Sequence, residues 1–160
     1  MDRILLSFDE YFMGVALLSA FRSRDPSCGV GACIVNKKNR IVGVGYNGFP
    51  NGCPEDALPQ AKEGGFLDTK YAYTCHAELN AILNSHGDLD GCRMYLSLFP
   101  CNECAKAIIQ AGICEVVYLS DYNTPEIDIF VAARRLFDLS GVKYKRLSPS
   151  INSLLINFQN

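Results

Sequence analysis

The sequence lacks an excess of basic residues: its 15 lysines and arginines are balanced by 17 aspartates and glutamates, which gives a formal net charge of −2. Proteins that bind nucleic acid through their overall charge carry a positive field, so this balance argues against that class of function. No apolar run is long enough to span a bilayer, and the first ten residues carry acids where a signal peptide needs bases. We therefore expect a cytoplasmic protein that binds neither nucleic acid nor a membrane.

Histidine is also scarce, with two residues, whereas there are eight cysteines. A disulfide scaffold is typical of short secreted chains, but a chain of 160 residues, 49% of them hydrophobic, can form a core without disulfide bonds. We expect reduced thiols, some of them bound to a metal ion. We also expect a single domain over residues 1–160, with a core at about 9–147 and a C-terminal tail, 148–160, whose role the sequence leaves open.

Hydrophobic periodicity predicts that strands and helices alternate along most of the chain. Predicted helices cover residues 8–21, 76–83, 101–110 and 125–139, and predicted strands cover 30–35, 40–46, 93–98, 115–119 and 142–147. A polar turn joins the first two strands into an antiparallel hairpin, and the later alternation indicates parallel pairing. The fold class is therefore α/β, with one mixed sheet of about five strands between helices. Residues 47–74, rich in Gly, Pro and Asn, are expected to form a long ordered loop.

Two short motifs carry metal-binding chemistry. The first is H-x-E, with His76 and Glu78, and the second is P-C-x-x-C, with Cys101 and Cys104. One imidazole and two thiolates provide three zinc ligands and leave the fourth position open for water, as in catalytic zinc sites. Cysteines three apart lie on one side of a helix, and a helix N-terminus favours their thiolate forms. Residues two apart do not share a face, so Glu78 is expected to remain free for proton transfer.

Other interpretations of these motifs are open. A C-x-x-C pair is also a redox motif, although the upstream H-x-E and the proline before Cys101 favour a metal site. A closed structural zinc site would need a fourth ligand, for which the candidates are Cys53, Cys75 and Cys92. We expect these three cysteines, together with Cys28, Cys33 and Cys114, to be buried thiols, and we assign no function to His86.

Over residues 9–147 the sequence resembles the deoxycytidylate (dCMP) deaminases of the eukaryotic and viral type. The resemblance rests on segments 11–16, 22–26, 30–36, 45–53, 75–81, 98–105 and 109–112. The metal motifs are common to zinc deaminases in general, whereas segments 45–53 and 22–26 narrow the resemblance to enzymes that act on dCMP. The resemblance implies a three-layer α/β/α, cytidine-deaminase-like fold.

The resemblance also implies an activity, zinc-dependent hydrolysis of dCMP to dUMP and ammonia, with dUMP supplied for thymidylate synthesis. Zinc lowers the pKa of a bound water from about 15.7 to about 7. Glu78 would take the proton, protonate N3 of the cytosine and pass a proton to the leaving amine, a role that typically contributes about 10²–10⁴-fold. The alternatives are deamination of free (deoxy)cytidine or dCTP, deamination of a base in nucleic acid, and a non-catalytic zinc-stabilised module.

Further site residues follow from the resemblance. His76, Cys101 and Cys104 would be the zinc ligands, Asn47 would contact the sugar and the base, and the backbone of Ala77 would read the cytosine edge. Members of this family are typically homohexamers, activated by dCTP and inhibited by dTTP, with Mg²⁺ accompanying the nucleotide. The effector pocket would include Gly48, Phe49, Pro50, Asn51, Gly52 and Cys53.

The effector and phosphate assignments each have a physical basis and an alternative. A glycine-rich turn lets backbone N–H groups approach phosphates, but a tight turn also requires glycine. Arg22, Ser23 and Arg24 are the candidates for the substrate phosphate, since guanidinium groups bind phosphate bidentately. The alternative is a solvated helix end, where arginine is favourable in any case. Tyr122 is a further candidate for this contact.

Overall fold

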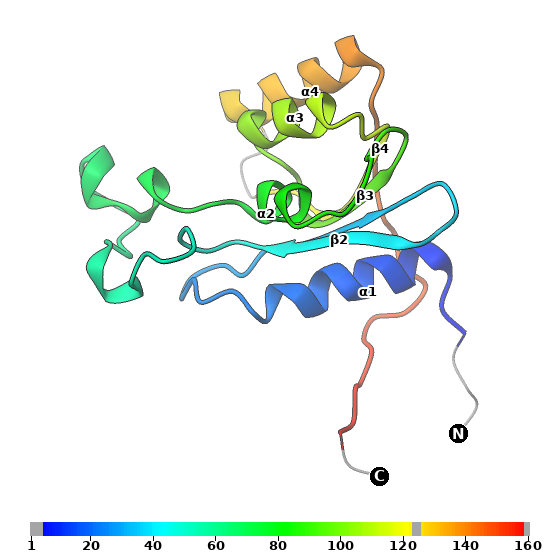
Figure 1. The fold of residues 1–160 in the computed structure, drawn as a ribbon, viewed down its shortest axis with the longest axis horizontal. Coiled ribbons are helices and arrows are strands. Elements are labelled where there is room, and N and C mark those ends of the chain that lie inside the picture. The colour runs from blue at the N-terminus through cyan, green and yellow to red at the C-terminus, as the bar shows by residue number, and fades with distance from the viewer. Residues whose placement is uncertain (1–4, 123–125, 159–160) are drawn as a thin grey trace.

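Five strands form one mixed sheet in the computed structural model, which describes residues 5–122 and 126–158 (Figure 1). The strand order is β2-β1-β3-β4-β5, and β1 is antiparallel to both β2 and β3, whereas β3, β4 and β5 are parallel. The bounds are Gly31–Val35 for β1, Ile41–Tyr46 for β2, Arg93–Leu98 for β3, Glu115–Ser120 for β4 and Lys143–Arg146 for β5. The predicted five-stranded mixed sheet and its opening hairpin are confirmed.

Four α-helices cover the two faces of this sheet in the described part of the chain. Helix α1 packs on one face, and α2, α3 and α4 lie on the opposite face, so the predicted three-layer arrangement is confirmed (Figure 1). The bounds are Phe8–Ala20 for α1, Ala77–Leu83 for α2, Asn102–Gln110 for α3 and Asp128–Ser140 for α4. The predicted start of the last helix at residue 125 lies outside the described residues. No helix within residues 5–122 and 126–158 is long and apolar enough to cross a membrane.

The alternation of side chains along the strands separates the core into two clusters, one on each face. On the α1 side, Phe12 and Tyr95 pack in a tilted pair with a ring-centroid distance of 5.3 Å. On the other side, Ile34, Met94 and Leu96 are fully buried beneath α2, α3 and α4. Strand β1 is buried along its whole length because it lies between two strands and between two helical layers. The sheet is thus held rigidly where its strands lead into the site.

Helix α2 approaches β2 unusually closely, and glycine makes this possible. A methyl group at Gly45 would overlap the carbonyl oxygen of Ala77 and the backbone nitrogen of Ala81. The buried residues of α2 are accordingly small or functional, namely Ala77, Glu78 and Ala81, whereas Leu83 is 70% exposed. Close packing of this kind fixes the first turn of α2, which carries the H-x-E motif.

Residues 47–74 form a long excursion between β2 and α2, as predicted. Three short 3₁₀ turns, at Glu55–Ala57, Phe66–Asp68 and Lys70–Ala72, are its regular elements. The two ends of the excursion are tied together by an isolated antiparallel bridge between Gly48 and Cys75, with N···O distances of 3.0 and 2.8 Å. This bridge lies directly before His76, so the excursion returns the chain to a defined point at the site.

Candidate active site

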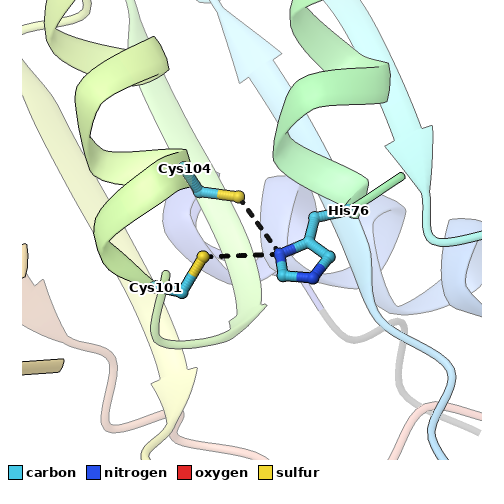
Figure 2. A group of neighbouring side chains, drawn as sticks. All are labelled: His76, Cys101 and Cys104. Carbon is cyan, nitrogen blue, oxygen red and sulfur yellow. Dashed lines mark hydrogen bonds between the residues drawn. The ribbon is translucent and has the colours of Figure 1, made fainter. Parts of the chain in front are cut away.

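The three predicted metal ligands come together at the N-termini of two neighbouring helices (Figure 2). His76 is the N-cap residue of α2, Cys101 is the N-cap residue of α3, and Cys104 lies in the first turn of α3. The imidazole Nδ1 of His76 lies 3.5 Å from Sγ of Cys101 and 3.3 Å from Sγ of Cys104. The two motifs, 25 residues apart in sequence, therefore converge on one point.

The spacing of these donor atoms fits a tetrahedral zinc ion. Zinc–sulfur bonds of about 2.3 Å and zinc–nitrogen bonds of about 2.0–2.1 Å at a tetrahedral angle place N and S about 3.6 Å apart. The observed separations of 3.5 and 3.3 Å agree with this geometry. No other His, Cys, Asp or Glu of the described residues joins the group, so none of Cys53, Cys75 and Cys92 closes it as a fourth ligand. The arrangement is that of an open zinc site with three protein ligands.

The hydrogen bonds within this group favour the ligand form of Cys101. Cys101 receives a hydrogen bond from Cys104 and another from His76, which together outweigh burial and lower the pKa of the Cys101 thiol to about 4. The hydrogen bond to Cys101, with burial, raises the pKa of Cys104. The hydrogen bond to Cys101 also raises the pKa of His76, against the effect of burial. The lowered pKa favours the thiolate of Cys101, the form in which cysteine binds metal ions.

Glu78 lies beside the metal ligands without belonging to them. Its side chain is 4% exposed, and burial raises the pKa of its carboxyl group. The Cys104 thiol is a hydrogen-bond partner of this carboxyl. The placement agrees with the expectation from the H-x-E spacing that Glu78 stays off the metal ion. A buried carboxyl next to an open metal position is suited to moving protons.

A cavity of about 410 Å³ opens above these residues, within the size range typical of small-molecule sites. Asn47, Ala77 and Tyr122, all predicted from the sequence to contact substrate, line it together with His76 and Glu78. Its remaining lining residues are Asp25, Ser27, Cys28, Val30, Lys62, Lys70, Tyr71, Thr74, Leu98 and Phe99. The cavity therefore combines one of the metal ligands, His76, with a buried carboxyl and several polar groups.

Asn47 is held by three hydrogen bonds. Its Oδ1 accepts the backbone N–H of Val30 at 2.8 Å, and its Nδ2 donates to the carbonyl of Cys28 at 3.0 Å and to Asp25 at 3.5 Å. Because the side chain is 6% exposed, these contacts fix the amide in one orientation at the cavity wall. Asn47 also connects the segment before β1 to the end of β2.

Sequence reasoning missed the buried ion pair in the same wall. Nζ of Lys70 donates to Oδ2 of Asp25 at 2.5 Å and to Oγ of Ser27 at 2.6 Å, and each charged side chain is 7% exposed. Burial acts to raise the pKa of Asp25, but the hydrogen bonds from Lys70 and Ser27 outweigh it and lower this pKa to about 2. The two charged residues are 45 positions apart, so no local motif could have revealed the pair.

Other predicted residues lie in a second recess of about 210 Å³. Arg22 and Arg24 line this recess and not the metal-site cavity, and Arg24 pairs with Glu55 at 3.0 Å. The predicted effector residues lie here too, namely Gly48, Phe49, Pro50, Asn51, Gly52 and Cys53. Ser23 lines neither hollow, and its hydroxyl accepts the N–H of Asp25 at 3.2 Å. The structure thus groups the two arginines with the effector loop.

The expectation that the remaining cysteines are buried thiols is wrong for three of them. Cys28, Cys53 and Cys114 are exposed, whereas Cys33 and Cys92 are buried and Cys75 is half-buried. The exposed cysteines lie in loops outside the regular elements, where the sequence gives little information on burial.

The fold and the site together define the class of zinc-dependent hydrolytic deaminases. In that class a histidine and two cysteines hold zinc, and a glutamate that is not a ligand acts as the general acid and base. The comparison with known proteins is more specific. Residues 6–120 match the family described as the cytidine and deoxycytidylate deaminase zinc-binding region. The chain belongs to this family.

Individual relatives cover nearly the whole chain. The deoxycytidylate deaminase of Mus musculus is 56% identical over 158 residues, which are 97% of this chain and 88% of the relative. The deoxycytidylate deaminase of Homo sapiens is 55% identical over 157 residues, with the same coverage. Among solved structures, the dCMP deaminase from the cyanophage S-TIM5 in complex with dCMP and dUMP has a TM-score of 0.65 and 25% identity. It covers 91% of this chain and is itself covered over its full length.

Proposed function

We propose that this protein catalyses the zinc-dependent hydrolytic deamination of dCMP to dUMP and ammonia, and so supplies dUMP for thymidylate synthesis. The observation that carries the proposal is the convergence of His76, Cys101 and Cys104 near the buried carboxyl of Glu78, with His76 and Glu78 lining a cavity of about 410 Å³. The names of the mammalian relatives, deoxycytidylate deaminases more than 50% identical over 97% of the chain, support dCMP as the substrate.

The chain supplies a metal site, a proton carrier and a binding wall. His76, Cys101 and Cys104 would hold a zinc ion, whose chemistry would be to lower the pKa of a water molecule to about 7 and so supply a nucleophile at neutral pH. Glu78, buried at the side of the ligands, takes the proton from this water and delivers it to N3 of the cytosine ring. The same carboxyl then takes the proton of the new C4 hydroxyl and passes it to the exocyclic amine, so that the C4 carbonyl forms, the C–N bond breaks and ammonia leaves. Water and dCMP thus become dUMP and ammonia, with Glu78 returned to its starting state.

The cavity wall supplies the groups that hold the pyrimidine nucleotide. We assign the cytosine edge to the backbone of Ala77, and the sugar and base to the Asn47 amide; this assignment is supported by the place of both residues in the cavity lining. Tyr122 closes another part of the wall, where its ring stacks on Phe130 at 4.3 Å. Contact of Arg22, Ser23 or Arg24 with the substrate phosphate stays a prediction, since these residues lie outside the lining of this cavity.

We further propose that the second recess binds a nucleotide effector, with dCTP activating and dTTP inhibiting and with Mg²⁺ bound to the triphosphate. Two features support it: the arginines 22 and 24 lie beside the glycine-containing segment 48–53, and Gly48 is hydrogen bonded to Cys75 directly before His76. A ligand that moves segment 48–53 would therefore act on a metal ligand through one backbone bridge. Assembly into homohexamers and a cytoplasmic location complete the proposal.

Ammonia release tests the substrate directly. Purified protein is assayed with dCMP, dCTP, cytidine and deoxycytidine side by side, each with and without dTTP. Preference for dCMP is the expected result, and its suppression by dTTP supports the effector recess. Equal turnover of all four compounds would leave the zinc chemistry standing and remove dCMP specificity. If dTTP does not inhibit and dCTP does not alter the dCMP saturation curve, the effector proposal is wrong.

The Glu78→Gln variant separates catalysis from a purely structural zinc site. The amide cannot carry the proton, so turnover of dCMP should fall by at least about 10²-fold while zinc content stays at the wild-type level. Glu103→Gln is the matched control, because Glu103 lies between the ligands Cys101 and Cys104 in sequence but is exposed and paired with Lys106 at 2.7 Å. Full activity in Glu78→Gln would favour a non-catalytic module.

A further inference from the structure

We infer that Lys62 recognises the 5′-phosphate of the substrate and so makes the site prefer a nucleotide to a nucleoside. The inference rests on the proposed function, since it assigns one end of dCMP to a part of the cavity that the metal chemistry does not use. Sequence patterns do not mark Lys62, which lies in the irregular excursion 47–74.

The charges that line the cavity single out this lysine. The charged side chains in the lining, besides His76, are Asp25, Lys62, Lys70 and Glu78. Lys70 is neutralised by its buried pair with Asp25. Within residues 5–122 and 126–158, Lys62 takes part in no ion pair, so it is the lining cation whose charge is available to a ligand. Arg24, the alternative cation, lines the other recess and is paired with Glu55.

The position of Lys62 in the cavity agrees with the direction in which dCMP must lie. The cytosine ring has to reach the metal ligands and Glu78, which is 4% exposed and marks the inner end. The phosphate, at the other end of the nucleotide, must then lie toward the opening. Lys62 is exposed and still lines the cavity, which places it at this rim. Lysine binds phosphate as a point charge and needs no fixed geometry of its own.

The backbone that carries Lys62 is anchored to the cavity wall. The carbonyl of the preceding residue, Ala61, accepts the backbone N–H of Lys70 at 3.0 Å. The side chain of Lys70 is in turn buried and bonded to Asp25 and Ser27. Lys62 is therefore connected through one backbone bond to the most deeply buried ion pair of the site. Because the backbone at Lys62 is already held in place, less conformational entropy is lost when the side chain binds phosphate.

The test compares Lys62→Ala with wild type on two substrates, dCMP and deoxycytidine, which differ by the phosphate. Loss of one charge-assisted contact at an exposed site should raise KM for dCMP about tenfold and leave kcat at saturation little changed. The dCMP preference, measured as the ratio of the two kcat/KM values, should fall by a similar factor. Lys62→Arg keeps the charge and should retain most of the preference. Lys38→Ala, at an exposed lysine of the β1–β2 turn, is the matched control.

The outcomes separate this inference from the proposed function. If wild type prefers dCMP and Lys62→Ala keeps that preference, the phosphate assignment is wrong while the deaminase proposal stands. A rise in KM with Arg24→Ala but not with Lys62→Ala would place the phosphate near Arg24 instead. Equal losses on both substrates would show that Lys62 supports the fold of the rim and not the phosphate. Absence of dCMP turnover in wild type would overturn the proposed function and the inference together.

Discussion

Replacing Lys70 by methionine should destabilise the fold by about 3 kcal/mol at neutral pH. The ammonium of Lys70 and the carboxylate of Asp25 are each 7% exposed, and removing one partner of a buried pair typically costs about 3–5 kcal/mol. The lower end of this energy range applies because Oδ1 of Asp25 keeps three hydrogen bonds in the variant. The donors are the backbone N–H of Ser27 at 2.8 Å, the hydroxyl of Ser27 at 2.7 Å and the backbone N–H of Cys28 at 3.1 Å. Methionine preserves most of the side-chain volume, so the change reports mainly on charge.

The pH dependence of this effect has a defined sign. The pKa of Asp25 is about 2 in the folded protein against an ordinary value of 3.8. A carboxyl whose pKa is lowered by folding stabilises the protein above its unfolded pKa, and this stability is lost as the pH falls through the folded pKa. The corresponding free energy is roughly 2 kcal/mol. The difference in stability between wild type and Lys70→Met should therefore be largest above pH 4 and shrink as the pH falls toward 2.

Urea unfolding followed by circular dichroism, at several pH values between 7 and 3, measures both effects. The double variant Asp25→Asn/Lys70→Met should lose less than the sum of the two single variants, because the second change removes the group that the first leaves unpaired. Lys106→Met is the control, since the exposed pair of Lys106 with Glu103 should contribute less than about 1 kcal/mol. A Lys70→Met protein whose free energy of unfolding lies within about 0.5 kcal/mol of wild type at pH 7, against the expected loss of about 3 kcal/mol, would refute the reasoning.

Three further changes test other parts of the site. Gly45→Ala should force α2 away from β2 and lower zinc content, stability and activity together. Gly48→Ala is the control, because its methyl group would meet nothing within 4 Å and should leave stability nearly unchanged. Thermal unfolding and metal analysis compare the two variants. Cys104→Ala removes one of the three ligands, so zinc should be lost on dialysis against a chelator that wild type withstands, as metal analysis would show. Phe130→Leu removes the ring on which Tyr122 stacks and should raise KM for dCMP more than it lowers kcat in steady-state assays.

Element positions could be predicted because the strands and helices have clear periodicity, but the buried face of α1 could be predicted only in part. The apolar residues Phe8, Tyr11, Phe12, Val15 and Leu18 recur at three- and four-residue spacing and predict the buried face of α1. Phe8, Tyr11 and Leu18 are nevertheless 61%, 48% and 52% exposed, whereas Phe12 and Ala16 are fully buried. The reason is close packing, since a methyl group at Gly31 would overlap the carbonyl oxygen of Ala16. Helices that approach a sheet through small residues leave large ones outside, and hydrophobic periodicity does not register this.

The site divides in the same way into a predictable and an unpredictable part. His76, Cys101 and Cys104 could be identified because each lies in a short motif at the start of a helix, where local geometry decides which side chains converge. The wall that includes Asp25 and Lys70 depends on contacts across 45 residues and leaves no pattern in the sequence. For the same reason the arginines after α1 could not be assigned to one hollow or the other before the structure was known.

The backbone bridge between Gly48 and Cys75 separates the metal site, whose geometry must stay constant, from a segment whose length and sequence can vary. It encloses residues 49–74 of the excursion and lies immediately before His76, so a change in the number of enclosed residues need not shift the metal ligand. Doubling the length of a flexible loop costs only about 0.6 kcal/mol in closure entropy. Lys62 and Lys70 lie inside the excursion, whereas the zinc ligands and Glu78 lie outside it. Insertions and deletions in this segment are thus a route by which substrate range can diverge while the deamination chemistry is inherited intact.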